Sequence, residues 1–262
     1  MSEDIYVEDA DGIATIVLNR PEKRNAISYE GWLELRRLAT ELAADDSVRV
    51  VVLKGADEKS FSAGADIKDF DRFRTNSEQA KVYQAAFDAA VDAIETLPMP
   101  TICHIKGFCI GGGCELTLAT DVRIAADNGR FAIPAARLGI VVGHHEIGRL
   151  VRLIGPGNSS YLLLSGRTID AAEAFRISLV TKVVPLEESD SYVEELAREI
   201  ADLAPLSHRV HKQILRQVVD NPSSAELTAE EATLPFVNFD SEDFQEGRRA
   251  FLERRKPRFS GH

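Results

Sequence analysis

Hydrophobic residues in the first two thirds of the chain form short apolar runs that are separated by stretches with helical spacing. The runs are β-branched or nearly continuous, as is typical of strands, and they occupy residues 12–19, 48–55, 101–107, 121–126 and 130–133. Helical spacing begins after Ser28, a suitable N-cap residue, and recurs at residues 79–97 until "PMP" ends it. Strands that alternate with helices predict an α/β core with parallel strands.

The pattern changes at about residue 191, where helical spacing takes over. Apolar residues keep this spacing on both sides of the segment "APLS", at Val193, Leu196, Ile200 and Leu203 and then at Val210, Ile214 and Val218. We therefore expect a core of residues 1–190 followed by an all-helical region of residues 191–262.

Composition narrows the class of protein. The chain has 262 residues, of which 44% are hydrophobic, so it can bury a large core. Its net charge of −11 argues against nucleic acid as a partner. No apolar run is long enough for a membrane span, and the acidic first residues do not resemble a signal peptide.

The three cysteines, Cys103, Cys109 and Cys114, lie in one apolar stretch. Their odd number and their spacing fit neither a disulfide framework nor a metal site. We expect buried thiols, no metal, and a reducing, cytoplasmic location.

The segment "GFCIGGGCELTLAT" (107–120) predicts a strand that turns directly into a helix. Such a turn exposes unpaired helix N–H groups, and glycines leave room for a ligand oxygen to approach them. Neither GK[ST] nor GxGxxG is present, so an oxyanion site is favoured over a phosphate site. Glu115 lies in the first turn, where the helix dipole should keep it ionised as an acid or base. A tight turn with an ordinary first-turn acid explains the same residues equally well.

A second loop of small residues supports the oxyanion interpretation. "FSAGADIKDF" (61–70) together with "GFCIGGGCEL" (107–116) resembles the crotonase family, also called the enoyl-CoA hydratase/isomerase superfamily. The segments "NRPEKRNAIS" (19–28), "LSGRTIDAAEAFRISLVTKVVP" (164–185) and "SEDFQEGRRAFLERRKPRF" (241–259) match in the same order. The resemblance implies an α/β fold, a spiral of ββα units followed by a helical oligomerisation region. It also implies an acyl-CoA thioester as substrate, no other cofactor, and a homotrimer or homohexamer.

The resemblance also implies roles for particular residues. The backbone N–H groups of Ala63 and Gly112 would hold the thioester oxygen as it becomes an enolate, and Glu115 would be the acid/base. Phe251 and Lys256 would reach the CoA of a neighbouring subunit. The remaining CoA-binding positions would be Lys23, Arg24, Ala63, Gly64, Ala65, Asp66, Ile67, Gly111 and Gly112.

Two departures from the family pattern leave the reaction open. The second glutamate of typical hydratases falls at Ala135, and His144, His145 and Glu146 stand where small residues are usual. Hydration or isomerisation of an enoyl-CoA has the most support. Hydrolysis or decarboxylation that uses His144 or His145 is an alternative, and a non-catalytic acyl-CoA binder is another. The histidines also fit a polar loop that caps a helix or packs at a subunit interface. Arg137 fits either a partner for a substrate carboxylate or a surface ion pair.

Overall fold

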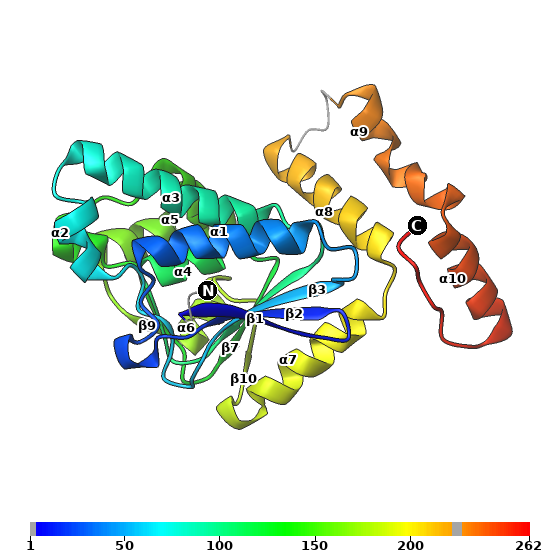
Figure 1. The fold of residues 1–262 in the computed structure, drawn as a ribbon, viewed down its shortest axis with the longest axis horizontal. Coiled ribbons are helices and arrows are strands. Elements are labelled where there is room, and N and C mark those ends of the chain that lie inside the picture. Colours follow the sequence, from blue (N-terminus) through cyan, green and yellow to red (C-terminus); the bar gives the residue numbers. More distant parts are fainter. Residues whose placement is uncertain (1–3, 222–226) are drawn as a thin grey trace.

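The computed structural model describes residues 4–221 and 227–262, and its core contains two β-sheets (Figure 1). The larger sheet has the strand order β1-β2-β3-β5-β7-β10. Only its β1/β2 pair is antiparallel, and the other pairs are parallel. Its strands are β1 (Ile5–Ala10), β2 (Ile13–Leu18), β3 (Val50–Gly55), β5 (Thr101–Ile105), β7 (Val122–Ala126) and β10 (Lys182–Val184).

The smaller sheet has the order β4-β6-β8-β9. It contains β4 (Ser60–Ser62), β6 (Phe108–Ile110), β8 (Arg130–Ala132) and β9 (Ile169–Asp170), and only the β8/β9 pair is antiparallel. The strand pairs β3/β4, β5/β6 and β7/β8 each place one strand in each sheet before the chain enters a helical segment. The predicted α/β fold built from ββα units is therefore confirmed.

Helices cover both faces of the larger sheet (Figure 1). One face carries α1 (Tyr29–Ala43), α3 (Ser77–Glu95), α4 (Gly112–Thr117) and α5 (His144–Ser165). The other face carries α7 (Leu186–Ala201), whose Val193 and Ala197 pack against Val50 and Ile102 of the sheet. The remaining helices are η1 (Pro21–Lys23), η2 (Ile67–Asp69), α2 (Phe70–Phe73), η3 (Ala135–Leu138), α6 (Ala171–Arg176), α8 (Pro205–Asp220), α9 (Ala229–Thr233), η4 (Leu234–Asp240) and α10 (Glu242–Glu253).

The elements expected from the apolar pattern are present, with shifted ends. Ser28 is the N-cap of α1, and its hydroxyl accepts a hydrogen bond from the Gly31 N–H. Sequence reasoning missed β1, the short strands β4, β6, β9 and β10, and helix α5. The division expected after residue 190 falls inside α7, and this helix packs against the sheet as part of the core.

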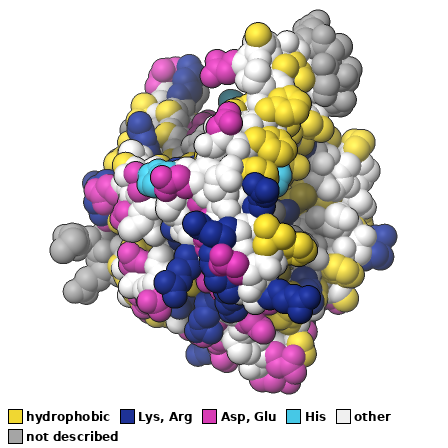
Figure 2. All heavy atoms as spheres, turned by 90° about the vertical axis from the view of Figure 1, so that its right-hand side faces the viewer, with side chains coloured by type: hydrophobic (Ala, Val, Ile, Leu, Met, Phe, Trp, Pro, Cys, Tyr) yellow, Lys and Arg dark blue, Asp and Glu magenta, His cyan; other side chains and the backbone are white. Residues whose placement is uncertain are grey.

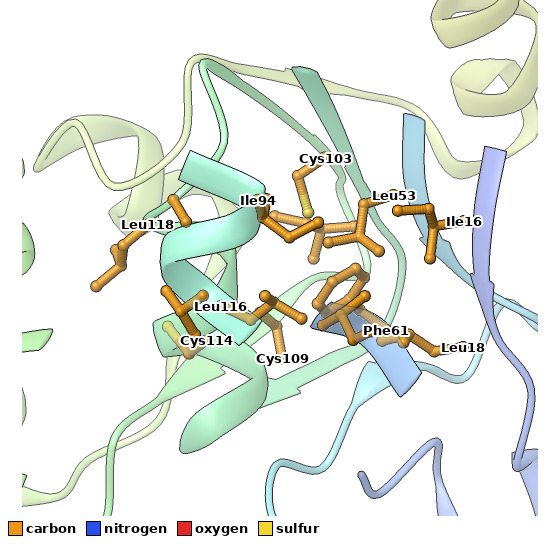
Figure 3. Close-up of a cluster of buried hydrophobic side chains, with 14 of the residues drawn as sticks. Ile16, Leu18, Leu53, Phe61, Ile94, Cys103, Cys109, Cys114, Leu116 and Leu118 are labelled. Atoms are coloured by element: carbon orange, nitrogen blue, oxygen red, sulfur yellow. The ribbon is translucent and has the colours of Figure 1, made fainter. Parts of the chain in front are cut away.

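The three cysteines lie within the packed core and have no disulfide. Cys109 of β6 and Cys114 of α4 belong to one buried cluster with Leu116 and Phe61 (Figure 3). All three are fully buried, and burial raises the pKa of the Cys103 and Cys109 thiols. They therefore behave as small hydrophobic side chains that fix α4 against the sheets.

The C-terminal helices carry many apolar side chains that this chain leaves exposed. Figure 1 shows α9 and α10 standing away from the sheets, and Figure 2 shows apolar side chains gathered on the upper part of that side of the molecule. The exposed set includes Leu215, Phe236, Phe239, Phe251 and Leu252. Within the described ranges, no helix has the length and apolarity that crossing a membrane requires.

Replacement of Gly113 by alanine tests the close packing of α4 against β4. An added Cβ would lie 2.7 Å from the Ser62 Cβ and 2.8 Å from the Ser62 carbonyl oxygen, so backbone must move. We expect Gly113→Ala to lower the free energy of unfolding by about 1–3 kcal/mol in urea titrations. Gly148→Ala is the matched control, because a Cβ there meets nothing within 4 Å. It should leave stability unchanged or raise it by up to about 1 kcal/mol, and equal effects of the two changes would contradict this account.

Candidate active site

The three glycines at the turn from β6 into α4 each have a different structural role. Gly111 has a φ of 53°, a conformation that other residues rarely adopt. Gly113 allows the contact with Ser62 described above. A Cβ on Gly112 would lie 3.3 Å from Phe87 and 3.4 Å from Trp32, so a side chain there would crowd two core aromatics. The turn therefore brings the start of α4 close to the neighbouring loop with its backbone uncovered.

The loop of residues 62–66 is held by hydrogen bonds to the segment before α1. The Ala63 N–H donates to the Arg24 carbonyl at 2.8 Å, and the Asp66 N–H donates to the Ile27 carbonyl at 2.8 Å. The Gly64 N–H donates to the Ser62 hydroxyl at 3.1 Å. The expectation that Ala63 supplies an oxyanion donor is therefore corrected, because its N–H is already used to hold the loop.

The amides of Ala65 and Gly112 remain as the exposed pair of donors. No acceptor is recorded for the Ala65 N–H within residues 4–221 and 227–262, and Gly112 is the first residue of α4, where helical N–H groups have no internal partner. A Cβ on Gly112 would lie 3.6 Å from the Ala65 nitrogen, and a Cβ on Gly64 would lie 3.0 Å from the Gly112 nitrogen. The two bends thus bring two unpaired amides together.

Both amides border one cavity of about 290 Å³, and Glu115 lies in its wall. The wall is mostly apolar, with Phe70, Phe87, Ile110 and Val142 among its residues. Tyr83 also lines it and accepts a hydrogen bond from the Trp32 indole N–H at 2.9 Å, while burial raises the Tyr83 pKa to about 12. The cavity can therefore hold an apolar chain beside one carboxyl group and two amides.

The environment of Glu115 favours its neutral form. Burial raises its pKa to about 8, with a further increase from the negative charges of Glu146 and Asp88, and Arg74 acts in the opposite direction. The Glu115 side chain is half-buried, and Glu115 lines this cavity. The expectation that the helix dipole keeps Glu115 ionised is thus corrected, because loss of hydration outweighs the dipole of a six-residue helix.

The other candidate residues in this region line two separate cavities. Ala135 and Arg137 line the same cavity as Glu115, whereas His144 and His145 line a second cavity of about 960 Å³ near α8. Arg137 is exposed, and no acidic partner is recorded for it among the described residues. The structure therefore brings Ala135 and Arg137 together with Glu115 but places the histidines elsewhere.

The residues expected to contact CoA also fall into groups. Ala63, Ala65, Ile67, Gly111 and Gly112 line the cavity. Gly64 has a φ of 90° and packs against the Ile110 carbonyl. Lys23 and Arg24 are exposed beside the loop, and the Arg24 guanidinium lies 5.1 Å from the centre of the Phe108 ring.

Asp66 has a structural role in this chain. Its carboxylate accepts hydrogen bonds from Arg20 at 2.9 Å and Lys23 at 3.3 Å. These partners lower its pKa although burial alone would raise it. The carboxylate is thus occupied in holding the loop.

Phe251 and Lys256 lie at the end of α10 and just after it, and both are exposed. Neither lines the cavity of this chain, so their expected contact with a neighbouring subunit's CoA stays a prediction. Within the described ranges, no cluster of side chains is suited to hold a metal ion.

Sequence reasoning missed Arg74 and Tyr83, and it noted Glu146 only as a departure from the family pattern, without a role. Arg74 follows α2 and lies 4.7 Å from the Phe70 ring centre and 4.9 Å from the Tyr83 ring centre. Tyr83 lies on α3 and Glu146 on α5, and the apolar spacing of a helix shows only which of its faces is buried. A polar residue at a buried helical position was the available signal for both.

The raised pKa of Glu115 predicts a pH-dependent cost in stability. In the unfolded chain Glu115 ionises near pH 4.5, whereas in the folded chain it keeps its proton to about pH 8. The folded state should therefore lose stability as pH rises between these values. We expect Glu115→Gln to be more stable than the parent in urea at pH 9, by on the order of 1–3 kcal/mol, and nearly equal below pH 4.5. A pH-independent difference would show that the Glu115 proton is not responsible.

Comparison with known proteins agrees with this geometry. The family model described as enoyl-CoA hydratase/isomerase matches residues 8–262. The crotonyl-CoA hydratase of Syntrophomonas wolfei is 35% identical over 98% of both chains, and the 2,3-dehydroadipyl-CoA hydratase of Escherichia coli is 33% identical over the full length of both. A crystal structure of an enoyl-CoA hydratase/carnithine racemase from Magnetospirillum magneticum superposes with a TM-score of 0.96 at 36% identity, over 100% of this chain and 97% of that one. The chain belongs to the enoyl-CoA hydratase/isomerase family.

Proposed function

We propose that this protein adds water across the double bond of a 2-enoyl-CoA, with Glu115 as its proton-transferring group. The observation that carries the proposal is a carboxyl group with a raised pKa in an apolar cavity beside two unpaired amides. Similarity to proteins named as crotonyl-CoA hydratase and short-chain-enoyl-CoA hydratase supports the choice of reaction.

The amides of Ala65 and Gly112 stabilise the charge that forms during the reaction. When water adds to the β-carbon, electrons move through the α-carbon onto the thioester oxygen and produce an enolate. Two unpaired backbone donors at the cavity wall stabilise this oxygen without reorganisation, and one such donor contributes about 3 kcal/mol. Because both donors are backbone groups, their position depends on the glycine turn and on the bonds that hold residues 62–66.

A single neutral carboxyl group can complete the addition without the glutamate that Ala135 replaces. One Glu115 oxygen accepts a proton from the attacking water, whose oxygen bonds to the β-carbon. The other Glu115 oxygen donates its proton to the α-carbon, and the enolate returns to a thioester. Glu115 ends with one proton, as it began, and the product contains the two hydrogens and the oxygen of one water.

Binding of the CoA portion rests on residues outside this cavity. Lys23 and Arg24 supply exposed positive charge for the CoA phosphates. The exposed apolar residues of the C-terminal helices form contacts between subunits of a homotrimer or homohexamer, where Phe251 and Lys256 approach the neighbour's CoA.

The role of Glu115 can be tested with crotonyl-CoA as substrate. Glu115→Gln keeps the shape of the side chain but cannot exchange the proton, so kcat for hydration should fall by at least about 100-fold. Loss of the enoyl-thioester absorbance measures the rate, and calorimetry with CoA should show nearly unchanged binding. Glu173→Gln, a half-buried acid on α6 that is paired with Arg176 and does not line the cavity, is the control and should keep full activity. Full activity of Glu115→Gln would refute the proposal, and parent protein that binds CoA thioesters without turnover would favour a non-catalytic binder.

The pH dependence distinguishes hydration by a neutral carboxyl group from isomerisation by a carboxylate base. Hydration as proposed requires protonated Glu115, so kcat/KM should be constant near pH 7 and should fall above about pH 8. A profile that instead rises through pH 8 would show that the ionised form is active. That result would favour isomerisation, which a 3-enoyl-CoA substrate would then confirm.

A further inference from the structure

Glu146 is a buried carboxyl group without a hydrogen-bond donor. It is the third residue of α5 and only 2% exposed. Neither of its side-chain oxygens has a hydrogen-bond partner in the described part of the chain. Buried polar groups are nearly always paired, and an unpaired buried charge is costly. The Glu146 carboxyl group faces that of Asp88, and these two groups can share a hydrogen bond only while one of them is protonated.

The charged groups around Glu146 do not neutralise it. Asp88 of α3 faces it, and the Asp88 carboxylate already accepts a hydrogen bond from the Gln84 amide at 2.7 Å. Arg149 lies one turn further along α5, but its guanidinium binds Asp92 and Glu95, and its Nη1 has no partner. Burial, followed by Asp88, raises the Glu146 pKa to about 7, and Arg149 offsets this only in part.

Glu146 lies directly behind the wall of the Glu115 cavity. A Cβ built on Gly143 would lie 2.4 Å from a Glu146 carboxyl oxygen and 3.3 Å from the Gln84 amide nitrogen, and both Gly143 and Gln84 line the cavity. The charge of Glu146 acts on Glu115, more strongly than that of Asp88. Arg74, after α2, is the cation that opposes it. The negative charge of Glu146 therefore raises the pKa of Glu115 across this poorly hydrated wall.

We propose that Glu146 is a positioning residue that keeps the catalytic proton on Glu115, so that the two side chains act as an acid pair. The negative charge of Glu146 delays ionisation of Glu115 as pH rises. Glu146 does not line the cavity and need not contact substrate. The effect of Glu146 on the reaction rate rests on the function proposed above. The effect of Glu146 on the Glu115 proton does not depend on that function.

Infrared titration without substrate tests the pair directly. The protonated-carboxyl absorption that is present in the parent and absent in Glu115→Gln belongs to Glu115. In Glu146→Gln this absorption should disappear at a pH lower by about one unit, because the neighbouring negative charge is gone. Glu146→Ala removes the same charge and replaces Glu146→Gln if that variant does not fold. Glu78→Gln, an exposed acid of α3 in an ion pair with Lys81, should leave the titration unchanged. An unchanged Glu115 titration in a folded Glu146 variant would overturn the proposal.

The kinetic measurement separates failure of this inference from failure of the proposed function. In Glu146→Gln the fall of kcat/KM at alkaline pH should begin about one unit lower than in the parent, with little change at pH 6. A residue that only fills space would change the rate equally at all pH values, and that result would contradict the proposal. If the infrared shift occurs while neither protein hydrates an enoyl-CoA, the acid pair stands and the proposed reaction is wrong.

Discussion

A carboxyl group that shares an apolar cavity with two unpaired amides is the constraint on which the rest of the structure depends. Water would hydrate all three groups if the cavity were open, and Glu115 would then ionise as an ordinary acid. The aromatic and aliphatic wall removes that hydration and leaves the groups available to a ligand. The same exclusion of water would strengthen each hydrogen bond that, in the proposed function, the amides make to a developing negative charge.

Most of the surrounding fold serves to hold the two amides in place. The donors come from bends after β4 and β6, which are neighbouring strands of the smaller sheet. Asn25 anchors the first bend by donating a hydrogen bond to the Ser60 carbonyl at 2.7 Å. Arg20 anchors it by donating a hydrogen bond to the Asp66 carboxylate at 2.9 Å. The second bend is fixed by the contact of Gly113 with Ser62. A buried cluster that includes Cys109, Cys114 and Leu116 packs α4 and β6 against the core (Figure 3).

Sequence patterns predicted the features that depend on neighbours along the chain. The apolar runs of β2, β3, β5 and β7, the Ser28 cap and the glycine turn before Glu115 are of this kind. The patterns could not show that the Ala63 amide already binds the Arg24 carbonyl, since the partners are 39 positions apart. They also could not show that the pKa of Glu115 is raised, because that shift depends on burial in the folded chain and on Glu146 and Asp88 from other helices. Short strands such as β4 and β6 carry too few residues for a period to be visible.

Glu115 lines the cavity beside the two amides, and the proposed role of these amides depends on the position of the substrate oxygen. A crystal structure with a bound acyl-CoA measures that position directly. The account predicts that the thioester oxygen lies about 2.7–3.1 Å from the nitrogens of both Ala65 and Gly112, with the acyl chain beside Glu115. A thioester oxygen that contacts neither amide, or an acyl chain that lies outside this cavity, would contradict it.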